Sequence, residues 1–226
     1  MTEGGASDEN GVALSGLRLQ GRYNGWFNQR LAETLNAGAG RLDQPAGLQA
    51  AVMRQLNHAY VMDWLWLGRF AEAFAALGRF APGLLHLPPA LEDMEAAVFD
   101  TVQAWSGPRG QMDSRLQAFV AGLAAEDLTI RVDFVTLAEG QPLRRPLWAL
   151  LTHLFNHQSL HRGEVIALMG LVGLSMGATD ILPLTEEADP RPPRPRAAPT
   201  AGRPDRRPLD AGAAYPPIGT GTLIGD

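Results

Sequence analysis

The amino-acid sequence predicts an all-α fold, a bundle of long helices with one small β-hairpin before the last helix. Four segments repeat apolar residues at intervals of three and four positions, which is the period of an amphipathic helix. Only one short segment alternates apolar and charged residues, so the chain lacks the repeated strand and helix succession of an α/β sheet. With 226 residues, of which 46% are hydrophobic, the chain can form one domain with a substantial core.

The first two helices are predicted in the first third of the chain. One spans residues 22 to 37. The next begins near Pro45, because proline suits a first helical turn, and ends near Leu77, with His58 in its middle. Apolar residues at helical spacing define both segments: Trp26, Phe27, Leu31 and Leu35 in the first, and Leu48, Val52, Leu56, Met62, Trp66 and Phe70 in the second.

The second half of the chain carries the remaining elements. A third helix is predicted after Pro88 and Pro89, through Val98 and Phe99, with an interruption at residues 106 to 108 before the apolar repeat resumes. Period-two alternation over residues 130 to 134 predicts a half-buried strand, and a hairpin can close around Glu139 and Gly140. The last helix is predicted from Pro146 to between Gly170 and Gly173.

Composition sets the domain boundaries. Residues 1–20, rich in Gly, Ser and acidic residues, are predicted to be a flexible N-terminal segment, and residues 21–182 form the bundle. Residues 183–226 hold 10 of the 17 prolines and few large apolar residues, which predicts a disordered Pro/Arg-rich tail. The segment Pro190 to Arg196 is either a peptide ligand for a partner domain or, more simply, part of this low-complexity tail.

Composition also excludes several functional classes. The chain has no cysteine, which excludes disulfides, thiolate metal sites and cysteine nucleophiles. The net charge is −5 and basic residues are scattered, so no nucleic-acid partner is expected. No signal peptide and no run of about 18 uncharged apolar residues is present, so we expect no membrane partner and a cytoplasmic location.

Four of the five histidines predict a metal site. His153, His157 and His161 follow one another at four-residue spacing in the last predicted helix. Residues four apart lie on one helix face, about 6 Å apart along the axis, so two such imidazoles can bind one ion. His153 and His161 are about 12 Å apart and cannot share an ion. A third ligand must therefore come from another helix, and His58 is the best candidate.

Four short motifs occur in an order that resembles the DinB family of metalloenzymes. They are NGWFNQRL at residues 24–31, LNH at 56–58, DxLWL at 63–67 and LLTHLFNHQSLHRG at 150–163. The resemblance covers about residues 20 to 182, and its most specific part is FNHxxxHRG preceded by a helix that contains LNH.

The resemblance implies a four-helix bundle of up-down-down-up type, often a homodimer, with one divalent ion bound by three histidines. By position these are His58, His157 and His161, the same residues that the spacing favours. Most relatives continue the motif with glutamine, whereas Glu164 follows Gly163 here. This departure leaves the three metal ligands intact.

The other site residues have competing interpretations. Glu164 either accepts a ring N–H or takes a proton as a catalytic residue, or it is a surface carboxylate that pairs with Arg162. Arg162 itself is predicted to lie on the surface. His153 is predicted to support the site without binding the ion, and His86 to be a hydrogen-bonded residue in a connection.

Three neutral imidazoles leave a bound ion an open coordination position, as in catalytic zinc sites. Known branches of the family imply a thiol S-transferase-like or related detoxifying enzyme that uses one divalent ion, zinc or else nickel or iron, with a low-molecular-weight thiol and a small-molecule substrate. The alternatives are a metal-dependent hydrolase and a non-enzymatic, stress-associated helical bundle with a structural ion. Two other classes of metal site are not expected. A zincin peptidase needs glutamate at the position of Gln158, and a di-iron bundle needs Glu-x-x-His motifs, which the chain lacks.

Overall fold

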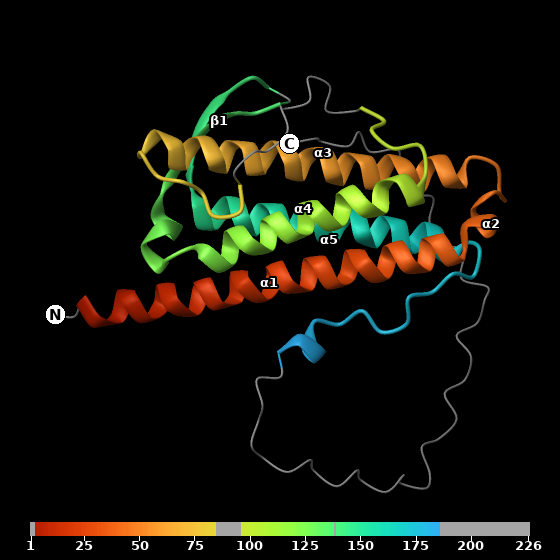
Figure 1. Cartoon of the computed structure of the whole chain (residues 1–226), viewed down its shortest axis with the longest axis horizontal. Helices are drawn as coiled ribbons and strands as arrows, with labels where there is room; N and C mark the ends of the chain where they lie inside the picture. Colours follow the sequence, from red (N-terminus) through yellow and green to blue (C-terminus); the bar gives the residue numbers. More distant parts are fainter. Residues whose placement is uncertain (1–2, 85–95, 138, 186–226) are drawn as a thin grey trace, which may run out of the picture.

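The computed structural model describes residues 3–84, 96–137 and 139–185, which are mostly helical (Figure 1). Among them are four long helices: α1 (Glu3–Ala37), α3 (Leu48–Ala76), α4 (Val102–Gly122) and α5 (Leu147–Gly170). Shorter elements connect them: the helix α2 (Ala39–Leu42), the 3₁₀ helices η1 (Ala125–Thr129) and η2 (Leu182–Leu184), and the antiparallel strands β1 (Arg131–Val135) and β2 (Pro142–Pro146). The predicted helical fold with one hairpin before the last helix is confirmed.

The long helices lie side by side (Figure 1). In that view α1 and α5 run from left to right, and α3 and α4 run in the opposite direction. The most extensive helix contacts are those of α1 with α4 and of α3 with α5. Two apolar clusters fill the interior, one around Phe70, Phe119 and Leu151 and the other around Leu31 and Val165.

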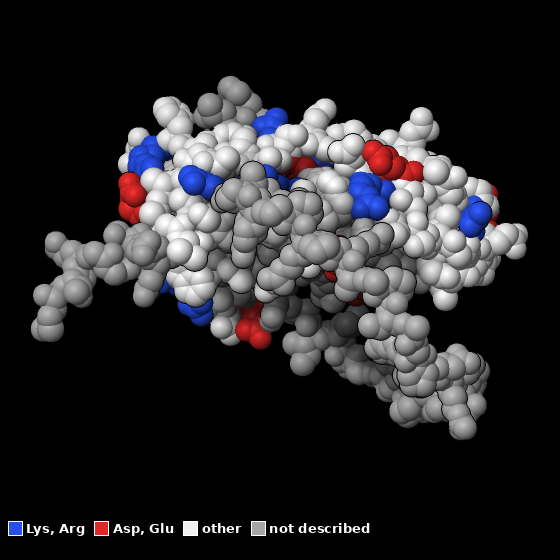
Figure 2. All heavy atoms as spheres, turned by 90° about the horizontal axis from the view of Figure 1, so that it is seen from below, with Lys and Arg blue, Asp and Glu red and all other residues white. Residues whose placement is uncertain are grey.

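Charges of both signs are distributed over the surface. On the face shown in Figure 2, arginines are interspersed with acidic side chains and are not gathered into one patch. The described side chains visible on that face form no basic patch of the kind with which proteins bind a phosphate backbone. In the described ranges, no helix is long and apolar enough to cross a membrane.

Helix α1 begins at Glu3, well before the start that the sequence predicted. Leu14 and Leu17 are buried in the apolar core, and the Arg18 guanidinium donates to two carbonyls at the C-terminal end of α4. These tertiary contacts stabilise a segment whose glycines and serines have weak intrinsic helix propensity. In the structure the chain from Leu14 onward is thus a packed helix, whereas the sequence placed residues 1–20 in a flexible segment.

Helix α4 continues through Pro108, where the sequence predicted an interruption. It begins at Val102, and the hydroxyl of Thr101 caps it by accepting a backbone N–H. The proline removes one backbone donor, but Trp105 and Arg109 on either side of it are buried and hold the helix in place. The predicted interruption was wrong because tertiary packing outweighs the local helix-breaking signal.

The segment before α4 is not helical from residue 96 to Thr101. The side-chain amide of Asn57 donates to the Phe99 carbonyl and accepts the Phe99 N–H, both at 2.9 Å. This pair of hydrogen bonds ties the segment to α3 beside His58. The helix predicted across Val98 and Phe99 was therefore wrong, and its predicted start after residues 88 and 89 lies outside the described residues.

A group of buried polar residues links all four long helices. This core polar network comprises Asn24 and Asn28 of α1, Asp63 of α3, Arg109 and Asp113 of α4, and Gln158 and Arg162 of α5. The Arg109 guanidinium contacts Asp63 at 2.8 Å and Asp113 at 2.6 Å. Asn24 and Asn28 both donate to Asp113. Two arginines thus accompany two aspartates, so the buried charges balance.

Arg162 belongs to this network and is not on the surface, contrary to the prediction. Arg162 is only 5% exposed, and its guanidinium donates to the side chains of Asn24 at 2.8 Å and Ser159 at 3.1 Å. The same guanidinium lies 4.6 Å from the ring centre of Phe27, in cation–π contact. Burial lowers the pKa of Arg162 to about 10, so the side chain stays charged at neutral pH.

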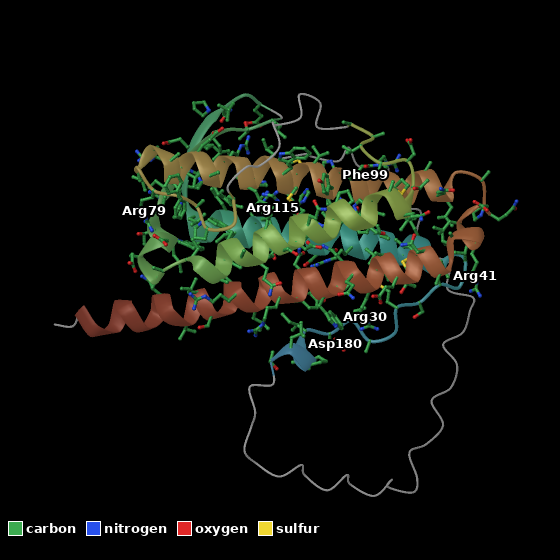
Figure 3. The ribbon with its side chains drawn as sticks, in the orientation of Figure 1. Arg30, Arg41, Arg79, Phe99, Arg115 and Asp180 are labelled. Carbon is green, nitrogen blue, oxygen red and sulfur yellow. The ribbon has the colours of Figure 1, made fainter. Side chains whose placement is uncertain are left out.

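Residues 171–185, the C-terminal strap, lie along α1 (Figure 3). Side chains of α1 and α2 donate to main-chain carbonyls of the strap: Tyr23 to Thr179 at 2.7 Å, Arg30 to Ala178 at 2.7 Å and also to Met176, and Arg41 to Gly173 at 3.3 Å. Met176 is buried in the core. The strap is therefore part of the packed structure, and residues 186–226, with most of the predicted tail, lie outside the described residues.

Replacing Arg109 by Met should destabilise the protein by about 3–5 kcal/mol, because it leaves Asp63 and Asp113 buried without their cation. Urea unfolding followed by circular dichroism measures this. The control is Arg144→Met, which removes an exposed 3.4 Å contact with Asp133 and should change the free energy of unfolding by less than about 0.5 kcal/mol. Equal stabilities of the two variants would show that the network contributes nothing.

We propose that the folded domain ends close to Thr185. A chain that ends at this residue should keep its helical circular dichroism and its melting temperature. A chain that ends at Gly170 should melt several degrees lower, since it loses the buried Met176 and the hydrogen bonds of the strap. If the chain that ends at Thr185 melted well below the full-length protein, the domain would extend beyond the strap.

Candidate metal centre

The structure brings together three of the four histidines that the sequence singled out. His58 comes from α3, and His157 and His161 lie one turn apart on α5, which packs along α3. One ring nitrogen of each lies within 4.8 Å of the other two. The three rings are half-buried, with centroids 4.3 to 5.3 Å apart. In the described part of the chain, this is the only group of three or more His, Cys, Asp or Glu side chains arranged to hold a metal ion.

The spacing of the donor atoms fits a tetrahedral ion. The Nε2 atoms of His157 and His161 are 3.1 Å apart. Zinc–nitrogen bonds of about 2.0–2.1 Å at tetrahedral angles place two ligand nitrogens roughly 3.3 Å apart. The distance between the two Nε2 atoms on α5 is therefore close to the one that a single ion would bridge. His58 supplies a third nitrogen from the neighbouring helix.

Hydrogen bonds fix the orientation of the His161 ring. Its Nδ1 lies 2.8 Å from Oε1 of Gln55 and 2.9 Å from Oε2 of Glu164. Both partners accept hydrogen bonds, so we assign the ring proton to Nδ1, which leaves the Nε2 lone pair directed toward His157. A metal ion bound through Nε2 needs this tautomer.

Burial keeps His157 neutral. Desolvation, the largest cause, acts together with the neighbouring rings of His161, His58 and His153 to lower its pKa to about 3. An imidazole must be unprotonated to bind a metal ion. His157 therefore meets this requirement over the whole physiological pH range.

Glu164 and His153 occupy distinct positions around the three histidines. Glu164 contacts the Nδ1 side of His161, away from the nitrogen that faces His157, and it does not pair with Arg162. His153 is one turn from His157, with ring centres 6.0 Å apart, and it also contacts Trp66. His153 is not part of the three-histidine group, and His86 lies outside the described residues.

Gln55 was not predicted from the sequence as a residue of the site. This residue precedes His58 by three positions on α3, so the two side chains share a helix face. The spacing alone could have marked Gln55 as a neighbour of the site. Its partner on α5 could not be identified, because that contact depends on how the two helices are aligned.

A pocket of about 550 Å³ adjoins His58. His58 lines it together with polar and apolar side chains that include Arg54, Asn57, Met53 and Phe99. This volume falls within the roughly 300–1,000 Å³ of small-molecule sites. The pocket therefore has room for a small organic ligand next to one of the three imidazoles.

One of three comparisons with known proteins gives a match. The family model described as the DinB family matches residues 20–196. Neither the curated proteins nor the solved structures contain a match. Since the family match covers well over half of the chain, this protein belongs to the DinB family.

Proposed function

We propose that this protein is a metal-dependent enzyme whose four long helices form an up-down-down-up bundle around one divalent ion. The observation that carries the proposal is the convergence of His58, His157 and His161 from two helices. Imidazole donors suit zinc best on grounds of availability, although nickel and iron accept the same ligands. A homodimer and a cytoplasmic location, both expected from the sequence, remain predictions.

The ligand count favours catalysis over a structural role. Structural zinc sites are closed by four protein ligands, whereas catalytic sites keep an open position. Among the described residues, no carboxylate joins the three histidines as a fourth ligand. When bound, a divalent ion in such a site lowers the pKa of a thiol or a water molecule and so provides a nucleophile.

The residues around the histidines have supporting roles in this proposal. Gln55 and Glu164 hold the Nδ1 proton of His161 and thereby present Nε2 as a ligand. Glu164, which the sequence offered as a catalytic residue, is better supported as a positioning residue because its carboxylate contacts Nδ1. The pocket beside His58 would admit the thiol and its electrophilic substrate.

Thiol S-transfer is the reaction class that we favour, as the thiol-dependent branches of the family imply. Hydrolysis is the second candidate, since the same three-histidine site could activate water. The two differ in whether a low-molecular-weight thiol enters the site. A purely structural ion would bind neither a thiol nor a substrate.

The protein should bind about one divalent ion per chain, and His58→Ala, His157→Ala and His161→Ala should each lose it. His153→Ala is the matched control, because it removes an imidazole next to the site that is not among the three ligands. Elemental analysis of untagged protein measures the metal content. Full retention by the His58 variant would contradict a site shared between α3 and α5.

Adding a low-molecular-weight thiol to the cobalt-substituted protein should produce a sulfur-to-metal charge-transfer band in the visible and near-ultraviolet spectrum. A thiol bound at the open position donates a thiolate, whereas water gives no such band. A panel of cellular thiols at millimolar concentration tests this. An unchanged spectrum with turnover of esters or amides would replace the transferase proposal with the hydrolase, and no response to either would favour a structural ion.

A further inference from the structure

A small cavity is lined both by side chains of the core polar network and by His161 of the candidate metal centre. Its volume is about 10 Å³. Side chains of all four long helices line it, among them Asn28, Gln55, Trp105, Arg109, Gln158 and His161. The cavity therefore touches both the buried charges and the helix faces that carry the metal ligand His161 and its partner Gln55.

Two buried hydrogen-bond donors at this cavity have no acceptor in the described part of the chain. They are Nε1 of Trp105 and Nε of Arg109, in residues that are each 2% exposed. Two further buried atoms without a hydrogen-bond partner, Nη1 of Arg109 and Oδ2 of Asp63, lie 2.8 Å apart as an ion pair. Trp105 and Arg109 are four positions apart on α4, so their side chains lie on one helix face. Leaving a buried N–H without an acceptor is costly, and native proteins rarely do so.

We propose that this cavity is a binding site for one ordered water molecule, which accepts hydrogen bonds from Trp105 and Arg109. The volume matches what a single water requires and excludes larger ligands. Buried waters typically have two to four polar partners. Asn28, Gln55 and Gln158 each carry an amide oxygen and line the same cavity, so they are the candidate acceptors for the hydrogens of the water.

The electrostatics favour water over an ion. Arg109 already contacts both Asp63 and Asp113, so its charge is compensated and does not call for an anion. A cation is disfavoured because Nε1 of Trp105 and Nε of Arg109 are N–H donors, and because Oδ2 of Asp63 is already paired with Arg109 at 2.8 Å. A neutral molecule that can both accept and donate hydrogen bonds is the remaining class, and only water is small enough.

The water would connect two parts of the molecule that share no direct bond in the described residues. On one side is Arg109, which joins α4 to α3, and on the other are Gln55 and the ring of His161. The site does not depend on the proposed activity or on a bound metal, because its two donors belong to the helical core.

Magnetic relaxation dispersion of water deuterons and oxygen-17 counts long-lived internal waters in the full-length protein. Trp105→Phe removes the indole N–H while keeping an aromatic ring, and it should lower the count by about one relative to the wild type. Trp148→Phe is the matched control, because that residue is 51% exposed, and it should leave the count unchanged. An unchanged count in the Trp105 variant would overturn the proposal.

A second measurement uses only the wild-type protein and so does not depend on the folding of a variant. The indole N–H of Trp105 should show a nuclear Overhauser effect to a water resonance, and a high-resolution crystal structure should show density within hydrogen-bonding distance of Nε1. An empty cavity in the crystal without the Overhauser effect would mean that the cavity is dry.

Discussion

The burial of charge between the four long helices is the constraint on which the rest of the structure depends. Arg109 contacts an aspartate of α3 and another of α4, and that second aspartate accepts hydrogen bonds from α1. An apolar core would tolerate small rotations of each helix, but a buried ion pair loses its compensation when one partner turns away. The network therefore fixes the rotation of every long helix about its axis.

This fixed rotation is what orients the metal centre. On α5, each of the two histidines is followed directly by a buried polar residue: His157 by Gln158, and His161 by Arg162. The two histidines themselves are half-buried around the candidate site. On α3, Asn57 is buried against the Phe99 segment and its neighbour His58 joins the other imidazoles. Each of the three histidines thus has a sequence neighbour that is held in the interior, so the core determines where the three rings meet.

Sequence patterns predicted the site better than its surroundings. Four-residue spacing identified His157 and His161, and the motif match placed His58, because both signals depend on one helix at a time. The buried position of Arg162 was missed because arginine is normally exposed, and its acceptor Asn24 lies on α1, far away in sequence. Gln55 and the early start of α1 were missed for the same reason, since their contacts arise only when the helices pack.

The way the C-terminal strap is held has a consequence for its tolerance of sequence change. Tyr23, Arg30 and Arg41 bind its main-chain carbonyls, which every amino acid provides. Substitutions along much of residues 171–185 should therefore be neutral if the path of the backbone is kept. Substitution of the α1 and α2 side chains that donate these hydrogen bonds should be tolerated less well. Arg30 in particular donates from two nitrogens to two carbonyls, a fork that the single ammonium of lysine does not reproduce.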